Sequence, residues 1–407
     1  MKCRHCENPL ENTFLDLGFS PPSNAYLTED ALNRPEKYYP LKVDVCNNCW
    51  LVQTQDYAQA DELFSPDYAY FSSTSTSWLA HAKHYTEAII ARLGLSETSY
   101  VIEVASNDGY LLKNFLAAGI PCLGIEPTAS TATVAEQFQI PVLREFFDEE
   151  LGKKLALKGK QADLIIGNNV YAHVPNINDF THGLKAALKP GGTLTLEFPH
   201  LLQLIEHTQF DTVYHEHFSY LSLHTVSCIF EAAGLRLWDV EQISTHGGSL
   251  RVFGCHADDA RQTNPLVEAL YAEEVRRGLQ CLDIYKNFQV KANRLKDDLI
   301  DFLIEKKRAG KKVAAYGAAA KGNTLLNYAG VKPDLLPFVC DAASAKQGKF
   351  MPGSHIPILP PSVLVEFNPD FVVILPWNIA EEITSQLESL VTKNTKFVTA
   401  VPRLQIT

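Results

Sequence analysis

The chain of 407 residues is longer than one ordinary domain, and its 46% hydrophobic content is enough for two or three separate cores. A formal net charge of −11 and the lack of a strong basic cluster argue against a polyanionic partner, so we expect no nucleic acid binding. The sequence has neither a run of about eighteen apolar residues that would span a membrane nor the apolar segment of a signal peptide at its start. We therefore expect a cytoplasmic protein, monomeric or homodimeric, that acts on a small molecule.

Two Cys-x-x-Cys motifs lie in the first fifty residues, separated by 39 residues. Each motif presents two thiolates from one tight turn, and two motifs together give the tetrahedral sulfur set that zinc prefers. Because four cysteines leave no open coordination position, we expect a structural zinc ion. Two disulfides or a redox pair are the alternatives, which a reducing compartment and the duplicated motif disfavour. The expected ligands are Cys3, Cys6, Cys46 and Cys49.

The other five cysteines lie among apolar residues and are expected in buried cores; they are Cys122, Cys228, Cys255, Cys281 and Cys340. Residues 63–75 are rich in aromatic and hydroxyl side chains, as in an inert linker or in a lid that carries Tyr68, Tyr70 and Ser73 onto a ligand. Residues 78–93 then have the apolar spacing of an amphipathic helix.

Residues 100–118 have the pattern of a strand, a tight turn and a helix, the first βα unit of a doubly wound sheet. A second strand, residues 122–125, ends in a glutamate that is well placed to accept hydrogen bonds from ribose hydroxyls. The turn lacks the three glycines of a dinucleotide site, which favours a cofactor without phosphates. The expected cofactor contacts here are Glu103, Ser106, Asn107, Asp108, Gly109 and Glu126.

Two later segments extend this sheet. Residues 163–170 read as a fourth strand, and residues 188–197 as a Lys-Pro-Gly-Gly turn that enters a fifth. These segments resemble those of class I S-adenosylmethionine-dependent methyltransferases. By that resemblance Phe147 could flank the adenine, although it could equally be a core residue, and Asn168 could bind the amino-acid end of the cofactor. His173 follows the fourth strand, where it could face the acceptor.

Residues 214–220 place two histidines, a glutamate and a tyrosine within four positions, a set that is costly to bury without partners. Metal binding is one interpretation, because His-x-His is a common ligand spacing. General acid–base catalysis is the other, since histidine titrates near neutral pH and a neighbouring glutamate can orient it. We favour acid–base catalysis, because the zinc-hydrolase pattern His-Glu-x-x-His is absent.

The last hundred residues begin with a second βα unit, preceded by a largely helical connection over residues 262–310 that could also serve as a dimerisation surface. The small-residue turn at the helix start is a natural anion site, with Lys321 adding a positive charge. We expect Tyr316, Lys321 and Asn323 to contact a nucleotide diphosphate. A purely structural dimer or lid domain is the alternative.

The paired cysteine motifs and four segments, residues 103–109, 214–220, 246–251 and 316–323, occur together and in this order. As a set they resemble the sugar C-methyltransferase family, whose members act on nucleotide-linked keto-deoxysugars. The resemblance implies a zinc-binding domain (1–65), an S-adenosylmethionine-dependent methyltransferase domain (66–305) and a Rossmann-like α/β substrate-binding domain (306–407).

The resemblance also assigns roles. His217 would be the base that removes the proton next to the ketone, and the same pocket would hold Tyr214, Glu216, His173 and Tyr68. Tyr70 and Ser73 would face the cofactor, and His246 and Arg251 the substrate. The expected reaction is S-adenosylmethionine-dependent methylation of a nucleotide-linked 4-keto-deoxysugar, with C3 as the expected carbon. The alternatives are O- or N-transfer, methylation at another sugar carbon such as C5, and a non-catalytic zinc-ribbon binding protein.

Overall fold

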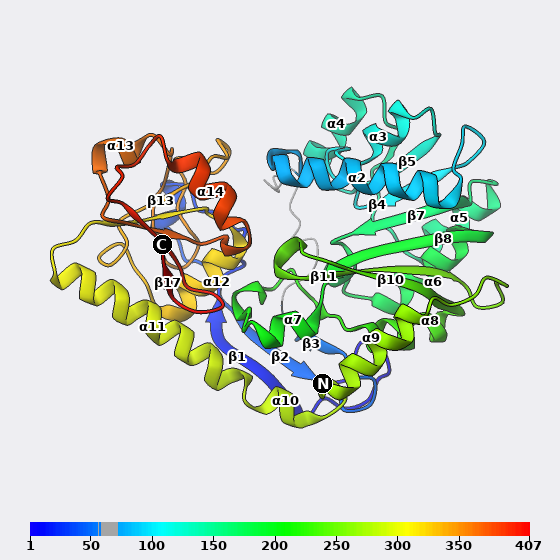
Figure 1. The fold of residues 1–407 in the computed structure, drawn as a ribbon, viewed down its shortest axis with the longest axis horizontal. Helices are drawn as coiled ribbons and strands as arrows, with labels where there is room; N and C mark the ends of the chain where they lie inside the picture. Colours follow the sequence, from blue (N-terminus) through cyan, green and yellow to red (C-terminus); the bar gives the residue numbers. More distant parts are fainter. Residues whose placement is uncertain (56, 58–71) are drawn as a thin grey trace.

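The computed structural model describes residues 1–55, 57 and 72–407, in which the strands form three sheets (Figure 1). Tyr68 and Tyr70 lie outside the described residues. The central and C-terminal sheets form separate lobes, and the N-terminal strands lie against one side of both. Every helix that the structure describes is too short or too polar to span a bilayer.

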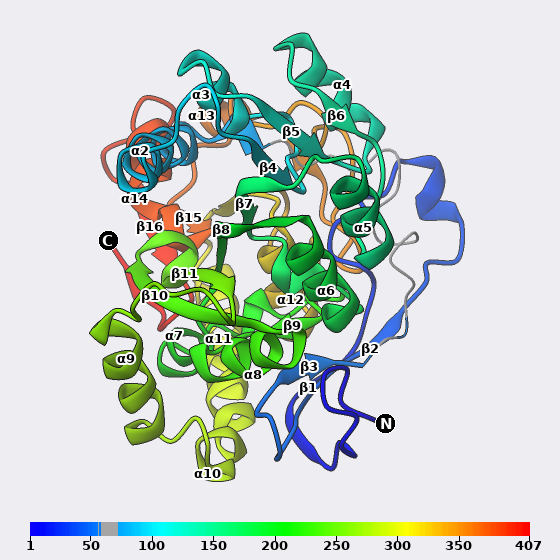
Figure 2. The same cartoon turned by 90° about the vertical axis from the view of Figure 1, so that its right-hand side faces the viewer.

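The N-terminal sheet has the antiparallel order β1-β2-β3-β9, and its fourth strand comes from the central part of the chain. Figure 2 shows β9 beside the N-terminal strands. Its elements are β1 (Asn12–Ser20), β2 (Tyr39–Val45), β3 (Val52–Thr54), β9 (Ser219–Tyr220) and the short turn η1 (Asp30–Asn33). Since β9 ends the predicted acid–base segment, the N-terminal sheet directly supports that segment.

The central sheet has seven strands in the order β10-β11-β8-β7-β4-β5-β6. The strands β6, β5, β4, β7 and β8 are parallel, whereas β11 and β10 add antiparallel to the edge at β8. This arrangement confirms the predicted class I methyltransferase-like sheet. The strands are β4 (Val101–Val104), β5 (Cys122–Ile125), β6 (Val142–Leu143), β7 (Ala162–Asn168), β8 (Leu188–Pro199), β10 (Leu235–Ile243) and β11 (Ser249–His256).

Helices cover both faces of the central sheet, as the alternation of strand and helix predicts. They are α2 (Thr76–Leu93), α3 (Leu112–Ala117), α4 (Ala129–Gln137), α5 (Glu149–Leu157), α6 (Ile177–Ala187) and α8 (Leu223–Ala233). The short helix α7 (Leu201–Glu206) instead packs with the N-terminal strands and α11. The predicted amphipathic helix is α2: the Ser75 side chain accepts from the Trp78 backbone at its start, and Gly94 ends it with a positive φ of 63°. Short turns complete this part, namely η2 (Ser72–Thr74), η3 (Tyr171–His173), η4 (Phe210–Thr212) and η5 (Thr245–Gly247).

The C-terminal sheet has the order β14-β13-β12-β15-β16-β17, parallel except for β17. Its elements are β12 (Val313–Tyr316), α12 (Ala320–Ala329), β13 (Val339–Cys340), β14 (Ile358–Leu359), α13 (Val363–Phe367), β15 (Phe371–Ile374), η6 (Trp377–Ile379), α14 (Ala380–Leu387), β16 (Lys396–Thr399) and β17 (Gln405–Ile406). It is the predicted second α/β unit.

Three helices connect the two lobes: α9 (Pro265–Arg276), α10 (Leu282–Lys286) and α11 (Phe288–Arg308). The first residue of α11, Phe288, stacks on Phe14 of β1 with ring centroids 4.5 Å apart. One apolar cluster therefore runs from the N-terminal sheet through α11 into the C-terminal sheet. The prediction for the isolated cysteines is correct for Cys122, Cys255 and Cys340, but Cys281 is exposed because it precedes α10 in a surface turn, and Cys228 is only half-buried.

Candidate active site

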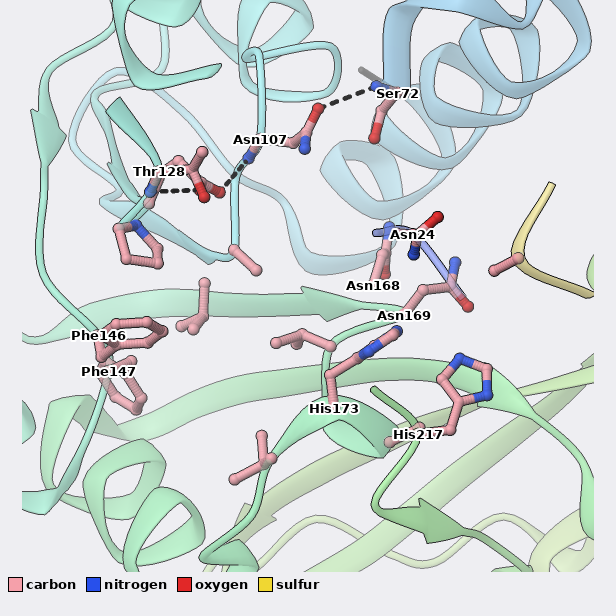
Figure 3. A pocket seen from close by; sticks show the side chains of 18 of the residues that line it. Asn24, Ser72, Asn107, Thr128, Phe146, Phe147, Asn168, Asn169, His173 and His217 are labelled. Atoms are coloured by element: carbon pink, nitrogen blue, oxygen red, sulfur yellow. Dashed lines mark hydrogen bonds between the residues drawn. The ribbon is translucent and has the colours of Figure 1, made fainter. Parts of the chain in front are cut away.

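A cavity of about 710 Å³ opens at the carboxyl ends of the central strands, where open α/β sheets bind ligands. The N-terminal part contributes Asn24 to its lining, and the C-terminal domain contributes Lys321 and Lys346. Figure 3 shows Phe146 and Phe147 on one side of this cavity and His173 and His217 on the other. One cavity thus has two chemically different ends.

The turn after β4 is built for close approach of the backbone. Asn107 and Gly109 have positive φ angles of 50° and 76°. A Cβ atom on Gly109 would lie 2.4 Å from a methyl of Ile140, so glycine is needed there for packing as well as for conformation. The Asn107 side chain accepts from the Ser72 backbone at 2.9 Å, and Asp108 accepts from the Ser73 backbone at 3.1 Å. The segment before α2 is therefore tied to this turn.

Glu126 stands at the end of β5, as predicted, and lines the cavity. Its two carboxylate oxygens accept from the backbone N–H groups of Asn107 and Thr128, each at 2.9 Å (Figure 3). Each oxygen keeps a second lone pair, so the carboxylate can also accept from ligand hydroxyl groups. The two backbone hydrogen bonds thus fix the Glu126 carboxylate in a position where it can bind such hydroxyl groups.

Several buried polar atoms around this end have no protein partner among the described residues. They are Oε2 of Glu103, Oγ of Ser106, Oδ1 of Asp108 and both amide atoms of Asn168. Burial, together with the charges of Asp108 and Glu126, raises the pKa of Glu103 well above its usual value. Buried polar atoms without partners are costly unless a ligand supplies the missing hydrogen bonds. Their chemistry fits the amino group and ribose hydroxyls of S-adenosylmethionine, and the described residues at this end of the cavity include no cluster of cations for a phosphate.

The aromatic side of the cavity comes from the loop after β6. Phe147 packs edge-on against Phe180, with ring centroids 5.3 Å apart, and both rings line the cavity. Phe146 is 55% exposed although it also lines the cavity. Both phenylalanines of this loop therefore lie at the cavity, and the role of Phe147 as an adenine wall stays a prediction.

The opposite end holds the histidines. Nδ1 of His217 lies 2.9 Å from the carbonyl oxygen of Thr212, which can only accept, so Nδ1 carries a proton and donates it. In the neutral ring Nε2 is then unprotonated, and it accepts from the Tyr214 hydroxyl at 2.7 Å. The His173 ring lies edge-on, with centroids 4.5 Å apart. The Nε2 lone pair of His217 therefore accepts from the Tyr214 hydroxyl at the cavity, and a neutral ring in this position can act as a general base when a substrate takes the place of that hydroxyl.

The electrostatics keep these rings neutral. Burial, followed by the nearby charges of His173, His246 and Lys321, lowers the pKa of His217 well below its usual value. Burial lowers the pKa of His173 to about 4, and burial together with Lys321 lowers that of His246 to about 4. At neutral pH each ring is thus able to accept a proton.

Glu216 is next to His217 in the chain but does not line the cavity. It is 1% exposed, and its Oε1 accepts from the Asn24 side chain at 3.2 Å. Burial raises the pKa of Glu216 to about 7, so its proton occupancy changes near neutral pH. The other histidine of the segment, His215, packs against the Tyr39 ring, which leaves it outside the cavity.

The four predicted zinc ligands come together. The Sγ atoms of Cys3, Cys6, Cys46 and Cys49 all lie within 4.8 Å of one another. The distances from Cys3 to Cys49 and from Cys6 to Cys46 are both 3.5 Å, which fits the edges of a tetrahedral sulfur site. His5 is bonded through Nδ1 to the Asn178 side chain at 2.8 Å, outside the thiolate set. Since thiolates fill every position, the donor set suits a structural zinc ion.

Comparison with known proteins agrees with this organisation. Residues 3–64 match a family described as a zinc binding domain, residues 78–240 a methyltransferase domain, and residues 244–402 a C-methyltransferase C-terminal domain. The chain is 32% identical over 405 residues to C-methyltransferase NovU of Streptomyces niveus, covering 100% of this chain and 96% of that protein. The chain belongs to the C-methyltransferase family. It is an S-adenosylmethionine-dependent C-methyltransferase with an N-terminal zinc-binding domain.

Solved methyltransferase structures resemble part of this C-methyltransferase. Magnesium protoporphyrin IX methyltransferase of Synechocystis PCC 6803 is 16% identical, with a TM-score of 0.34, and the match covers 43% of this chain and 81% of that one. The CcbJ methyltransferase of Streptomyces caelestis is 12% identical, with a TM-score of 0.35, over 43% of this chain and 89% of that one.

The structure of this C-methyltransferase gathers many of the predicted site residues around the cavity but separates others. His246 lines the cavity, where the Asn169 side chain lies 3.3 Å from its Nε2. Of the three predicted diphosphate contacts only Lys321 lines it. Tyr316 packs in the C-terminal core, and Asn323 donates to the Ser23 carbonyl at 2.6 Å.

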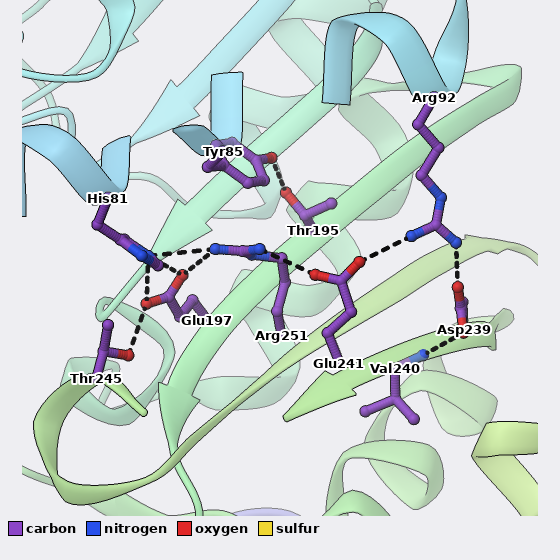
Figure 4. Close-up of polar contacts among 10 residues, drawn as sticks. All are labelled: His81, Tyr85, Arg92, Thr195, Glu197, Asp239, Val240, Glu241, Thr245 and Arg251. Atoms are coloured by element: carbon purple, nitrogen blue, oxygen red, sulfur yellow. Dashed lines mark hydrogen bonds and ion pairs between the residues drawn. The ribbon is translucent and has the colours of Figure 1, made fainter. Parts of the chain in front are cut away.

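Arg251 has a position different from the predicted one. Its guanidinium lies 2.9 Å from both Glu197 and Glu241 in a buried ion-pair chain, outside the cavity lining (Figure 4). Glu197 also accepts from His81 of α2 and from Thr245 next to His246. Arg251 therefore fastens α2 to the sheet edge, and its predicted contact with substrate is not supported by this geometry.

Sequence reasoning missed several lining residues of this C-methyltransferase, among them Asn24, Trp78, Asn169 and Lys346. Of these four, only Asn169 had a sequence pattern that could have revealed it, because it directly follows Asn168 at the end of a strand. Asn24 and Lys346 lie in loops whose approach to the cavity depends on tertiary packing. Trp78 reads as an ordinary residue of an amphipathic helix.

Proposed function

We propose that this C-methyltransferase methylates a nucleotide-linked 4-keto-deoxysugar, with C3 as the methylated carbon. The observation that carries the proposal is the state of His217, whose Nδ1–H is committed to a backbone carbonyl and whose Nε2 faces the cavity beside Tyr214. A carbon next to a ketone is not nucleophilic until it loses a proton, so C-methylation requires such a base.

We assign the following roles. His217 takes the proton from the carbon beside the ketone. Tyr214 holds the base in place by its hydroxyl group. His173 and Glu216 shape the same pocket, and Tyr68, which lies outside the described residues, belongs to this set by the family resemblance. S-adenosylmethionine, when bound, supplies the electrophilic methyl group. The chain's own task is to align the deprotonated carbon with it.

The cofactor would lie at the other end of the cavity. Glu126 would accept from the ribose hydroxyls, and the buried polar atoms that lack a partner among the described residues would receive the amino-acid end. Phe147 would cover the adenine. Tyr70, which lies outside the described residues, is proposed as a further cofactor contact because of the family resemblance. The proposed contacts are Glu103, Ser106, Asn107, Asp108, Gly109, Glu126, Asn168, Phe147 and Ser73.

The proposed domain limits are 1–65, 66–305 and 306–407. The first limit falls outside the described residues, close to residue 64, where the zinc-binding family match ends. The C-terminal family match begins at residue 244, well before 306. We keep 306 because β11 pairs with β8 and β10 and therefore belongs to the central sheet.

The test uses methyl-labelled S-adenosylmethionine with thymidine- and guanosine-linked 4-keto-6-deoxysugars, and NMR locates the label in the product. His217→Asn runs alongside, with His207→Asn as the matched control because His207 is exposed on the surface. Label on a ring carbon that is lost only in His217→Asn supports the proposal. Label on oxygen or nitrogen, or activity that survives His217→Asn, contradicts it.

A further inference from the structure

Lys321 brings a positive charge to the histidine end of the cavity. It stands in the first turn of α12 and lines the cavity together with His217 and His246. Its Nζ lies 2.6 Å from the Asn378 amide oxygen and 4.7 Å from the centroid of the Trp377 ring. Both of these partners are neutral, so they hold the ammonium group without cancelling its charge.

The nearest acid does not neutralise this charge. Within the described part of the chain no carboxylate forms an ion pair with Lys321. Asp211 influences it electrostatically, but Oδ2 of Asp211 accepts from the Trp377 indole N–H at 2.7 Å. The indole N–H therefore occupies one oxygen of that carboxylate while the indole ring face holds the ammonium group, and Oδ1 of Asp211 has no hydrogen-bond partner among the described residues. Burial lowers the pKa of Lys321, and Asp211 acts in the opposite direction.

The charge acts on the proposed base. Lys321 is among the causes that lower the pKa of both His217 and His246. A cation beside a base favours its neutral form, which is the form that accepts a proton. The same cation lies where negative charge develops when a ketone in this cavity loses its neighbouring proton.

We propose that Lys321 stabilises the enolate oxygen of the substrate rather than its diphosphate. This inference rests on the proposed function. His217 Nε2 takes the proton from the carbon, the electron pair of that C–H bond forms the C=C bond, and the carbonyl pair moves onto oxygen. The Lys321 ammonium group donates a hydrogen bond to that oxygen. The C=C electron pair then forms the new bond from carbon to methyl, and the carbonyl reforms. The pair of the broken methyl–sulfur bond stays on sulfur, so S-adenosylhomocysteine is the leaving group, and the proton leaves His217 to water.

A second cation on the same wall is available to the diphosphate. Lys346 lines the cavity, donates to the Ala318 carbonyl at 2.8 Å and lies 3.8 Å from the Asp341 carboxylate. It adjoins the start of α12, where backbone N–H groups favour anions. Substitution of Lys321 should therefore affect proton exchange, whereas substitution of Lys346 should affect binding of the diphosphate.

The test measures exchange of the C3 proton of a thymidine diphosphate-linked 4-keto-6-deoxysugar with solvent deuterium. Proton NMR follows it with S-adenosylhomocysteine present, so that methyl transfer plays no part. Lys321→Gln should lower exchange at saturating substrate about 10²–10³-fold, the usual effect of losing one oxyanion donor. Thymidine diphosphate affinity, measured by calorimetry, should change little. Lys396→Gln, on an exposed lysine of the same domain, is the matched control.

Two further readouts separate a chemical role from a structural one. Lys321→Arg keeps the charge and should retain more exchange than Lys321→Gln. Removing the charge should also raise the pKa of His217, which moves the acidic limb of the exchange rate to higher pH. Lys346→Gln should mainly weaken thymidine diphosphate binding.

If exchange survives in Lys321→Gln while thymidine diphosphate binding is lost, the inference is overturned. Lys321 would then be a contact of the diphosphate. Equal loss of exchange in Lys321→Gln and Lys321→Arg, with an unmoved pH profile, would also overturn it. Absence of exchange in the wild-type enzyme would overturn both the inference and the proposed function.

Discussion

Glu126→Gln separates the two tasks of the carboxylate at the end of β5. In the protein alone, the two oxygens accept from the backbone N–H groups of Asn107 and Thr128 at 2.9 Å each. A glutamine has one acceptor oxygen, so its NH₂ group must face one of these N–H donors. Hydrogen bonds to charged groups are each worth about 1.5–3 kcal/mol, so the loss of one should destabilise the fold by about that amount.

Cofactor affinity should fall as well. If the ribose hydroxyls donate to both oxygens, the glutamine again keeps one acceptor and loses one charge-assisted bond. A loss of about 1.5–3 kcal/mol in binding free energy corresponds to a dissociation constant that is roughly 10- to 150-fold larger. Calorimetry with S-adenosylhomocysteine measures this without any sugar substrate. Glu136→Gln is the matched control, because this exposed glutamate of α4 lies outside the cavity lining.

The result that refutes the reasoning is a lowered unfolding temperature with an unchanged dissociation constant. It would mean that Glu126 only shapes the turn after β4. Glu126→Asp provides a further check, because it keeps the charge but withdraws it by one methylene group. An affinity between those of the wild type and Glu126→Gln is expected.

The remaining predictions concern the base, the metal and pH. His217→Asn should slow methyl transfer about 10²–10⁴-fold, while calorimetry shows near-normal S-adenosylhomocysteine binding; a joint loss of binding would indicate a structural role instead. Cys46→Ser should lower both zinc content and methyl transfer, because β3 pairs with β9 next to His217; full activity in a zinc-free variant would contradict this. The unfolding free energy should fall as the pH drops from 6.5 towards 4, because His173 and His246, each with a pKa of about 4, stay neutral in the folded state while the unfolded chain takes up protons. Chemical denaturation at pH 7 and pH 5 measures this difference, and equal values would refute it.

Local patterns predicted the features that local geometry determines. The four cysteines converge because each pair shares one tight turn, so that two turns suffice to bring them together. Glu126 could be placed because parallel strands end at a common edge of the sheet. The positive φ angles at Asn107 and Gly109 likewise follow from the turn itself.

The cavity lining that the C-terminal domain contributes could not be predicted in the same way. Residues two positions apart on a helix point roughly 200° apart, so Lys321 and Asn323 face different surroundings although both belong to one motif. Lys321 faces the cavity, and Asn323 faces Ser23 of the N-terminal part. Arg251 was misplaced because its partner Glu197 lies on a different strand, and no local spacing reveals such a pair.

The loop that carries Ser23 and Asn24 has a consequence for how the enzyme is made. Asn323 reaches back 300 positions to Ser23, and Thr324 donates to the Val213 carbonyl at 2.9 Å. During translation the end of the cavity proposed to hold the cofactor can therefore form early, whereas the histidine end is complete only after α12 has left the ribosome. A nascent chain that ends before α12 should bind S-adenosylhomocysteine without possessing a finished catalytic pocket.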